Sequence, residues 1–257
     1  MTLFPQHGPI TCLLCFPEGR DHIERDGWRL DNNPGAWGAR DPLILVLGFS
    51  KGATQGNAWQ RGNFDAVPFA GARQRLTTVL RILGVLTATD TVDGHIRAGE
   101  RDLTFASLLR CGLAHRDPRS GKLATSGALI KRAFDQPFPA QTLSVCARSY
   151  LAALPPRLRL VVMLGSDSGY VDRCARLLGQ VGAGETVRSC AVAYRRGSVT
   201  FVHATHPSPA NGHFQAWAEG APDSAAGRKR ELARAAVRAS GQMLPVAAAP
   251  ARGRRDT

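Results

Sequence analysis

Long apolar runs are missing from this sequence, and so is a secretory leader. No stretch approaches the roughly 20 consecutive apolar residues that a membrane-spanning helix needs. The first ten residues lack both the basic start and the apolar centre of a signal peptide. We therefore expect a cytoplasmic protein with no membrane partner. In that compartment the six cysteines are expected to be reduced thiols or metal ligands rather than disulfides.

Acidic residues are scarce relative to basic ones. The chain of 257 residues has 20 Asp and Glu against 33 Lys and Arg, which gives a formal net charge of +13. A surface with this excess of positive charge attracts polyanions. On charge alone, nucleic acid is the first class of partner and an anionic membrane surface the second. Of these two we expect nucleic acid.

Apolar runs and amphipathic segments alternate along the chain. Short apolar runs predict buried strands at 43–47, 103–109, 158–164 and 199–204. Amphipathic spacing predicts helices at 76–83, 142–154, 168–178 and 228–243. This alternation predicts an α/β fold with three α/β/α layers around a central, mostly parallel four-stranded sheet. We expect one domain over residues 1–245, a disordered basic tail over 246–257, and a monomer.

Ligands of such folds bind beyond the carboxyl ends of the parallel strands. The loops 48–69, 107–115 and 203–214 are therefore expected on one rim of the sheet. The first begins with Gly48-Phe49-Ser50-Lys51, a Gly-rich turn that either brings backbone N–H groups to a phosphate or is a plain tight turn.

The third rim loop carries the sharpest short motif, His206-Pro207-Ser208-Pro209. Its two prolines fix a rigid loop at a strand end. A neutral His206 there can donate a hydrogen bond to charge that develops on a leaving group. The alternative is a histidine that only caps the turn.

Four cysteines have the spacing of a metal site. Cys12 and Cys15 form a Cys-x-x-Cys pair, whereas Cys111 and Cys146 stand apart after a predicted strand and inside a predicted helix. Thiolates are soft ligands that suit zinc and iron–sulfur clusters alike. The alternative is four unrelated cysteines packed as small apolar residues.

In their order along the chain, these elements resemble the uracil-DNA glycosylase superfamily, and within it the branches that carry an iron–sulfur cluster. The resemblance spans roughly residues 10–240. The strand and loop at 43–52 are similar to the first motif of the family, and His206–Asn211 to the second. Phe69-Ala70-Gly71 is similar to the segment that places an aromatic ring against the base, and Leu109-Arg110-Cys111 to a basic element with a cluster cysteine.

The resemblance implies a DNA glycosylase that removes uracil or another deaminated or damaged base in base excision repair, on duplex or single-stranded DNA. Cys12, Cys15, Cys111 and Cys146 would hold a 4Fe-4S cluster, with zinc as the alternative. His206 would stabilise the departing base, and Phe69 would stack on the base after it is flipped out.

The remaining site residues follow from the same resemblance. Backbone groups of residues 48–51 would bond the edge of the base, and Ser107 stands where relatives have an asparagine that reads it. Asn57 and Asp65 are the nearest substitutes for the residue that orients water, which Gly48–Gly52 lacks.

Contacts with the DNA itself complete the list. The loop containing Pro207, Ser208 and Asn211 would press into the minor groove. Phosphates would be held by Lys51, Arg61 and Arg110.

Two other functions remain open on the residues alone. One is a nucleic-acid-binding relative that retains the cluster without excision. The other is a nucleotide- or phosphate-binding α/β enzyme, which would use the Gly-rich loop.

Overall fold

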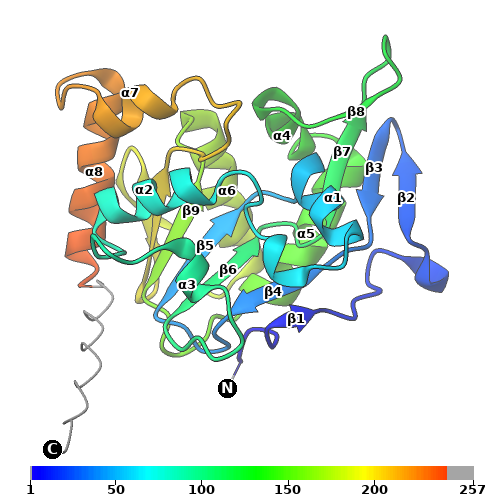
Figure 1. Cartoon of the computed structure of the whole chain (residues 1–257), viewed down its shortest axis with the longest axis horizontal. Coiled ribbons are helices and arrows are strands. Elements are labelled where there is room, and N and C mark those ends of the chain that lie inside the picture. Colours follow the sequence, from blue (N-terminus) through cyan, green and yellow to red (C-terminus); the bar gives the residue numbers. More distant parts are fainter. Residues whose placement is uncertain (1, 242–257) are drawn as a thin grey trace, which may run out of the picture.

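The computed structural model of the chain describes residues 2–241 and is drawn in Figure 1. The expected basic tail at 246–257 and the end of the expected domain lie outside the described residues. Within them the chain forms an α/β structure with two sheets. No helix in this part of the chain is long and apolar enough to cross a bilayer.

The larger sheet is mixed and has eight strands in the described residues. Their order is β1-β4-β6-β5-β9-β12-β11-β10. The bounds are β1 Gly8–Pro9, β4 Gly35–Gly38, β5 Ile44–Gly48, β6 Leu103–Ser107, β9 Leu160–Leu164, β10 Val187–Cys190, β11 Ala193–Arg196 and β12 Val199–Ala204. Strands β6, β5, β9 and β12 pair in parallel, and every pairing outside this block is antiparallel.

The prediction of a four-stranded, mostly parallel sheet was therefore wrong for the sheet as a whole. The four predicted strands form only its centre. The edge strands escaped prediction because their sequences are not apolar runs. Strand β4 reads Gly35-Ala-Trp-Gly38, and a Cβ on Gly38 would lie 2.4 Å from the carbonyl oxygen of Leu103. Strand β4 can approach β6 closely because Gly38 has no side chain. A search for hydrophobic periodicity cannot detect a strand that depends on a missing side chain.

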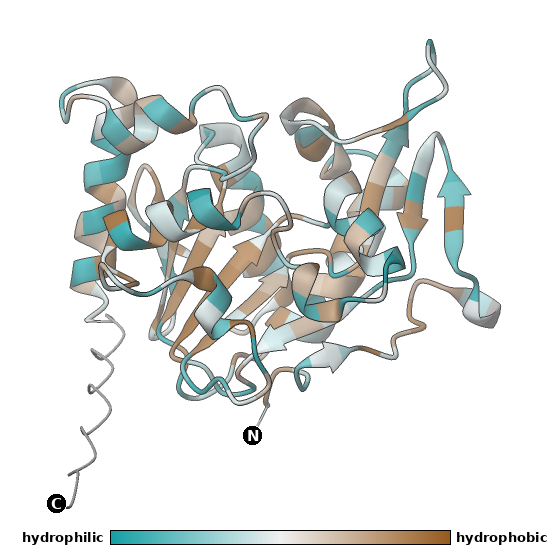
Figure 2. Ribbon diagram, in the orientation of Figure 1, coloured by the Kyte–Doolittle hydropathy of each residue, from teal (hydrophilic) through white to brown (hydrophobic). Residues whose placement is uncertain are grey.

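Helices cover both faces of the parallel block. Side chains alternate along β5, so that Leu45 and Leu47 enter one apolar cluster and Ile44 and Val46 the other. The first cluster includes residues of α4 (Gly127–Ala133), α5 (Pro137–Leu151) and α6 (Ser168–Val181). The second includes residues of α1 (Ala53–Gln60), α2 (Arg73–Leu83), α3 (Val92–His95), α7 (Phe214–Glu219) and α8 (Ala225–Ala239). Figure 2 shows the apolar strands between these two helical layers.

The smaller sheet is antiparallel and has the order β2-β3-β7-β8. Its strands are β2 His22–Arg25, β3 Trp28–Asp31, β7 Gly112–Arg116 and β8 Leu123–Ala124. Two short 3-10 turns, η1 (Pro17–Gly19) and η2 (Phe64–Ala66), complete the described elements. The N-terminal part of the chain, residues 8–38, therefore supplies strands to both sheets, whereas residues 112–124 supply two strands of the smaller sheet only.

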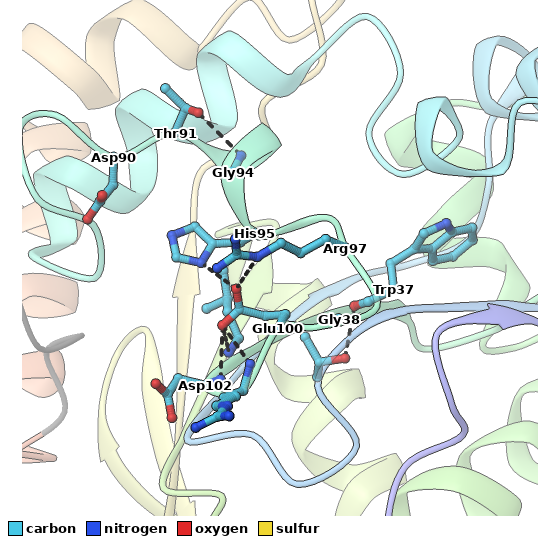
Figure 3. Close-up of polar contacts among 12 residues, drawn as sticks. Trp37, Gly38, Asp90, Thr91, Gly94, His95, Arg97, Glu100 and Asp102 are labelled. Carbon is cyan, nitrogen blue, oxygen red and sulfur yellow. Dashed lines mark hydrogen bonds and ion pairs between the residues drawn. The ribbon is translucent and has the colours of Figure 1, made fainter. Parts of the chain in front are cut away.

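The carboxylate of Glu100 holds the loop before β6 together by accepting several hydrogen bonds. Glu100 Oε1 accepts hydrogen bonds from the backbone N–H groups of Arg101 and Asp102, both at 3.0 Å, and Oε2 lies 3.0 Å from His95 Nδ1 (Figure 3). Burial alone would raise the pKa of Glu100. The hydrogen bonds from His95 and from the backbone outweigh that effect and lower the pKa to about 2.

Replacing this side chain, Glu100→Gln, is expected to lower the free energy of unfolding at pH 7 by about 1–3 kcal/mol, because a charged hydrogen-bond acceptor is lost. The pKa of Glu100 is about 2 in the folded protein and 4.5 in the unfolded chain. The ionised carboxylate therefore stabilises the fold above pH 4.5, and this contribution is lost as the pH falls from 4.5 towards about 2. The difference from wild type should therefore shrink between pH 5 and pH 3 in urea titrations. The exposed Glu185→Gln serves as control. A difference that does not change with pH would contradict this assignment.

Candidate functional site: a cysteine pocket beside the carboxyl rim

The four predicted metal-ligating cysteines line one pocket. Cys12 and Cys15 come from the N-terminal segment, Cys111 lies directly before β7, and Cys146 lies in α5. Segments far apart in the sequence thus meet at one pocket. The rest of the lining is mostly apolar and consists of Leu14, Phe16, Leu30, Pro34, Leu109, Arg110, Val145 and Tyr150. The thiols do not already form a closed site, since no group of three or more His, Cys, Asp or Glu side chains in residues 2–241 is arranged to hold a metal ion.

Two buried cations stand beside this pocket. Lys51 and Arg110 are each only 3% exposed. The Lys51 ammonium donates to the carbonyl oxygen of Arg110, and the backbone N–H of Arg110 donates to Cys146 Sγ at 3.3 Å. The Arg110 guanidinium lies 4.4 Å from the ring of Tyr150 and donates to the Gly35 carbonyl at 3.0 Å. Within residues 2–241 its Nε has no hydrogen-bond partner.

No carboxylate in the described residues forms an ion pair with either cation. A buried cation without a counter-charge is strongly destabilising. The neighbouring thiols do not supply the charge by themselves, because burial raises the pKa of Cys15 to about 11 and that of Cys111 to about 12. Metal binding deprotonates such thiols. A metal group with four thiolates would therefore bring net negative charge to this place, and the residues present fit such a group.

Three of the predicted residues meet where β5 ends. A Cβ built on Gly48, at the end of β5, would lie 3.5 Å from Phe69 Cε1 and 3.7 Å from Ser107 Oγ. Ser107 is the last residue of β6, so the aromatic ring meets the carboxyl ends of two adjacent parallel strands. The ring is only 7% exposed, and its edge also packs on Phe105.

Phe69 is held in an unusual backbone conformation. Its φ is +53°, which is a strained region for a bulky residue. Its N–H donates to Gln55 Oε1 at 3.2 Å, a contact across the loop that fixes this conformation. The sequence reasoning missed Gln55, because a glutamine on a short helix carries no signal until its partner is known.

Other residues of the first motif point away from the rim. The Phe49 side chain is buried against Phe134 and Tyr170 on the opposite face of the sheet, so a substrate contact there would be with its backbone. Lys51 and Arg110 are also buried, so the predicted phosphate contacts of these two side chains find no support in this geometry. Ser50 is half-buried and Arg61 is exposed, and their roles stay predictions.

The His206 loop is closed by its own hydrogen bonds. The Ser208 N–H donates to His206 Nδ1 at 3.1 Å, so a neutral ring carries its proton on Nε2. Burial lowers the pKa of His206, which favours this neutral form. The Asn211 amide donates to Thr205 Oγ1 at 3.0 Å and to the His206 carbonyl at 2.6 Å. Asn211 therefore shapes the loop, and its predicted contact with substrate finds no support in this geometry.

Helix α2 connects the two loops. Ala72 N–H donates to the Phe69 carbonyl at 2.8 Å directly before the helix. Arg75, in its first turn, donates to the Ser208 carbonyl at 3.0 Å, and its guanidinium lies 4.8 Å from the Phe214 ring. The segment with the aromatic ring and the loop with the histidine are thus braced by one element. Arg75 was not among the site residues predicted from the sequence.

The side chains of Asn57 and Asp65 make no described hydrogen bond with the other predicted site residues. Asn57 is exposed on α1. Asp65 is exposed, and its carboxylate lies 2.8 Å from His7 Nε2. Neither forms a hydrogen bond with Phe69, Ser107 or His206 among the described contacts, so their water-orienting role stays a prediction.

Comparison with known proteins assigns no family. No family model matches the chain, and no curated protein matches it significantly. The argument for function rests on the residues and their geometry.

The absence of a side chain at Gly48 predicts a sharp effect of substitution. We expect Gly48→Val to lower substrate turnover about 10–100-fold, because its methyl groups would fill the space between Phe69 and Ser107. Gly56→Ala is the control, since a Cβ there meets nothing within 4 Å. Thermal melts would show whether the fold persists. Equal turnover of wild type and a folded Gly48→Val variant would place the site elsewhere.

Proposed function

We propose that this protein is a DNA glycosylase, which hydrolyses the bond between deoxyribose and uracil or another deaminated or damaged base. The observation that carries the proposal is the meeting of Phe69, Gly48 and Ser107 at the carboxyl ends of β5 and β6. Through α2 this group is braced against the loop that presents His206. The excess of basic residues favours a polyanionic substrate.

Recognition would begin with a nucleotide that leaves the stacked helix and enters the rim. Phe69 offers an aromatic face for stacking, and the bare backbone at Gly48 lets the edge of the base approach N–H and C=O groups. The Ser107 hydroxyl can donate one hydrogen bond and accept others. Because Phe69 is 7% exposed, the entering base must displace the groups that now cover the ring.

The reaction breaks the bond between C1′ of the sugar and the ring nitrogen of the base. The bonding electron pair leaves with the base, which becomes anionic, and the sugar acquires oxocarbenium character. Neutral His206 would donate from Nε2 to the anionic base and lower the barrier electrostatically. Water then adds to C1′ and loses a proton, which completes the hydrolysis.

The four cysteines would hold a 4Fe-4S cluster, which supplies a structural cross-link and takes no part in electron transfer. A cluster binds one thiolate per iron, so its ligands can stand further apart than those of zinc, whose four sulfurs must lie about 2.3 Å from a single ion. Each of the four cysteines that line the pocket would supply the thiolate of one iron. The backbone N–H of Arg110 would remain a hydrogen-bond donor to the Cys146 sulfur.

An oligonucleotide panel tests the proposal. Labelled single strands and duplexes would carry uracil, hypoxanthine, xanthine or only normal bases at one position. After incubation and alkali, we expect strand scission at one or more modified bases and none at normal bases. Mass spectrometry should detect the free base. Intact strands throughout the panel, with protein shown to be folded and metal-loaded, would contradict the proposal.

A second candidate is a protein that binds DNA without excising bases. It is favoured by one observation: Asp65, the single acidic residue in residues 48–71, pairs with His7 on the surface. The first loop then offers no free carboxylate to orient water. Duplex binding together with an unreactive panel would select this candidate.

A further inference from the structure

A β-hairpin rises beside the candidate site and has no role in the chemistry above. We call residues 112–124 the β7–β8 hairpin; residues 117–122 form its tip. Figure 1 shows it projecting beyond the body of the molecule, on the side where α1 and α4 lie. Every residue from Pro118 to Leu123 is exposed.

The root of the hairpin is joined to the first rim loop. Gly112 forms a parallel bridge with Lys51, and a Cβ on Gly52 would lie 3.7 Å from the Thr125 hydroxyl. Both ends of the hairpin therefore lie next to the segment that follows β5, and the Gly112 end is bridged to it. Cys111 immediately precedes the hairpin, so the cysteine pocket anchors the same root.

The tip is ordered by its own hydrogen bonds. Asp117 Oδ1 accepts from the backbone N–H groups of Arg119 and Ser120, both at 2.8 Å. The Asp117 N–H donates to the Lys122 carbonyl, and the Gly121 N–H donates to the Asp117 carbonyl, each at 2.8 Å. Arg116 braces the turn by donating to the Gly121 carbonyl at 2.9 Å and to Glu24 at 2.6 Å. Such a tip loses little conformational entropy on binding.

Some charged side chains at and beside the tip have hydrogen-bond or ion-pair partners, and others are exposed. The Asp117 carboxylate faces its own backbone, and Arg116 is paired with Glu24. Arg119 and Lys122 remain exposed, and within residues 2–241 neither forms an ion pair with a carboxylate. Two unpaired cations on a rigid projection match the spaced charges of a nucleic-acid backbone.

We propose that the β7–β8 hairpin binds the DNA phosphate backbone next to the nucleotide at the rim, with Arg119 and Lys122 as its phosphate contacts. The hairpin and the His206 loop would then hold the DNA at two places around the site. The proposal deepens the proposed function in that it names a substrate-holding element. Its DNA-binding part can be tested whether or not a base is excised.

The test compares two double variants with equal change in charge. Arg119→Glu/Lys122→Glu alters the tip, and Arg40→Glu/Arg195→Glu alters two exposed arginines away from the hairpin. Fluorescence anisotropy would measure binding of each protein to a labelled undamaged duplex between 50 and 300 mM salt. Thermal melts would confirm that each variant is folded. Anionic lipid vesicles provide a separate arm.

We expect the tip variant to bind duplex roughly 10-fold or more weakly at low salt, with a salt slope smaller by about 2, since each lost phosphate contact removes about one. The control should retain most of the affinity and the slope. Equal affinity and slope in the two double variants, no duplex binding by wild type, or hairpin dependence on vesicles alone would each overturn the proposal. Hairpin-dependent binding with an unreactive oligonucleotide panel would preserve it and reject excision.

Discussion

Replacing His206 by alanine is expected to lower the rate of base excision about 10²–10³-fold, the usual cost of losing a preorganised donor to a developing anion. The geometry behind this expectation is the bond from Ser208 N–H to Nδ1, which directs the remaining ring proton to Nε2. Single-turnover measurements on the preferred base from the panel would isolate the chemical step. Binding of the duplex should change little, because the interaction strengthens as the bond breaks.

The matched control is His213→Ala, an exposed histidine in the same loop whose described hydrogen bond uses its backbone. It should excise at the wild-type rate. Since burial lowers the pKa of His206, the neutral donor should persist as the pH falls through the ordinary value of 6.5. A fully active His206→Ala variant would remove the residue from the mechanism.

The second large effect is expected from Cys111→Ser. The variant should lose most of its bound metal and melt about 10 °C or more below wild type, because metal binding contributes directly to folding free energy. Losing the metal group would also leave Lys51 and Arg110 buried without a counter-charge. Metal content per folded chain and thermal melts measure the two consequences separately.

Two cysteines outside the pocket provide controls. Cys190→Ser changes a half-buried thiol and should leave both metal and melting temperature near wild type. Cys174→Ser changes a buried core thiol, so it should lose stability while retaining metal. A Cys111→Ser variant that keeps its metal, or that is fully stable without it, would contradict the structural role.

Predictions from the sequence succeeded where burial follows from apolar side chains. The run at 199–204 is strand β12, and Arg73–Leu83 forms a helix around the predicted apolar stripe. Helix α5 begins earlier than expected, at Pro137, because proline at the first helical position needs no N–H partner. The convergence of the four cysteines came from the resemblance, since their spacing alone also permitted four unrelated core thiols.

The failed predictions share a physical cause. The type of a residue does not show which neighbouring groups will surround its side chain and allow a charged side chain to be buried. Lys51 was expected at a phosphate, yet its ammonium is buried 5.5 Å from the Trp37 ring and 5.7 Å from the Trp59 ring. Arg110 is buried because Tyr150 and the Gly35 carbonyl receive its guanidinium. The partners of Arg110 are distant in sequence, and those of Lys51 follow no periodic spacing, so no local pattern predicts the burial.

The account depends most directly on the four pocket cysteines acting as one metal site. Iron, zinc and acid-labile sulfide should therefore be measured in anaerobically purified protein, together with its visible absorption. We expect iron and sulfide in equal amounts, a brown protein, and loss of both elements in Cys111→Ser but not in Cys190→Ser. Folded protein with neither iron nor zinc, or with metal content that does not depend on Cys111, would contradict the account.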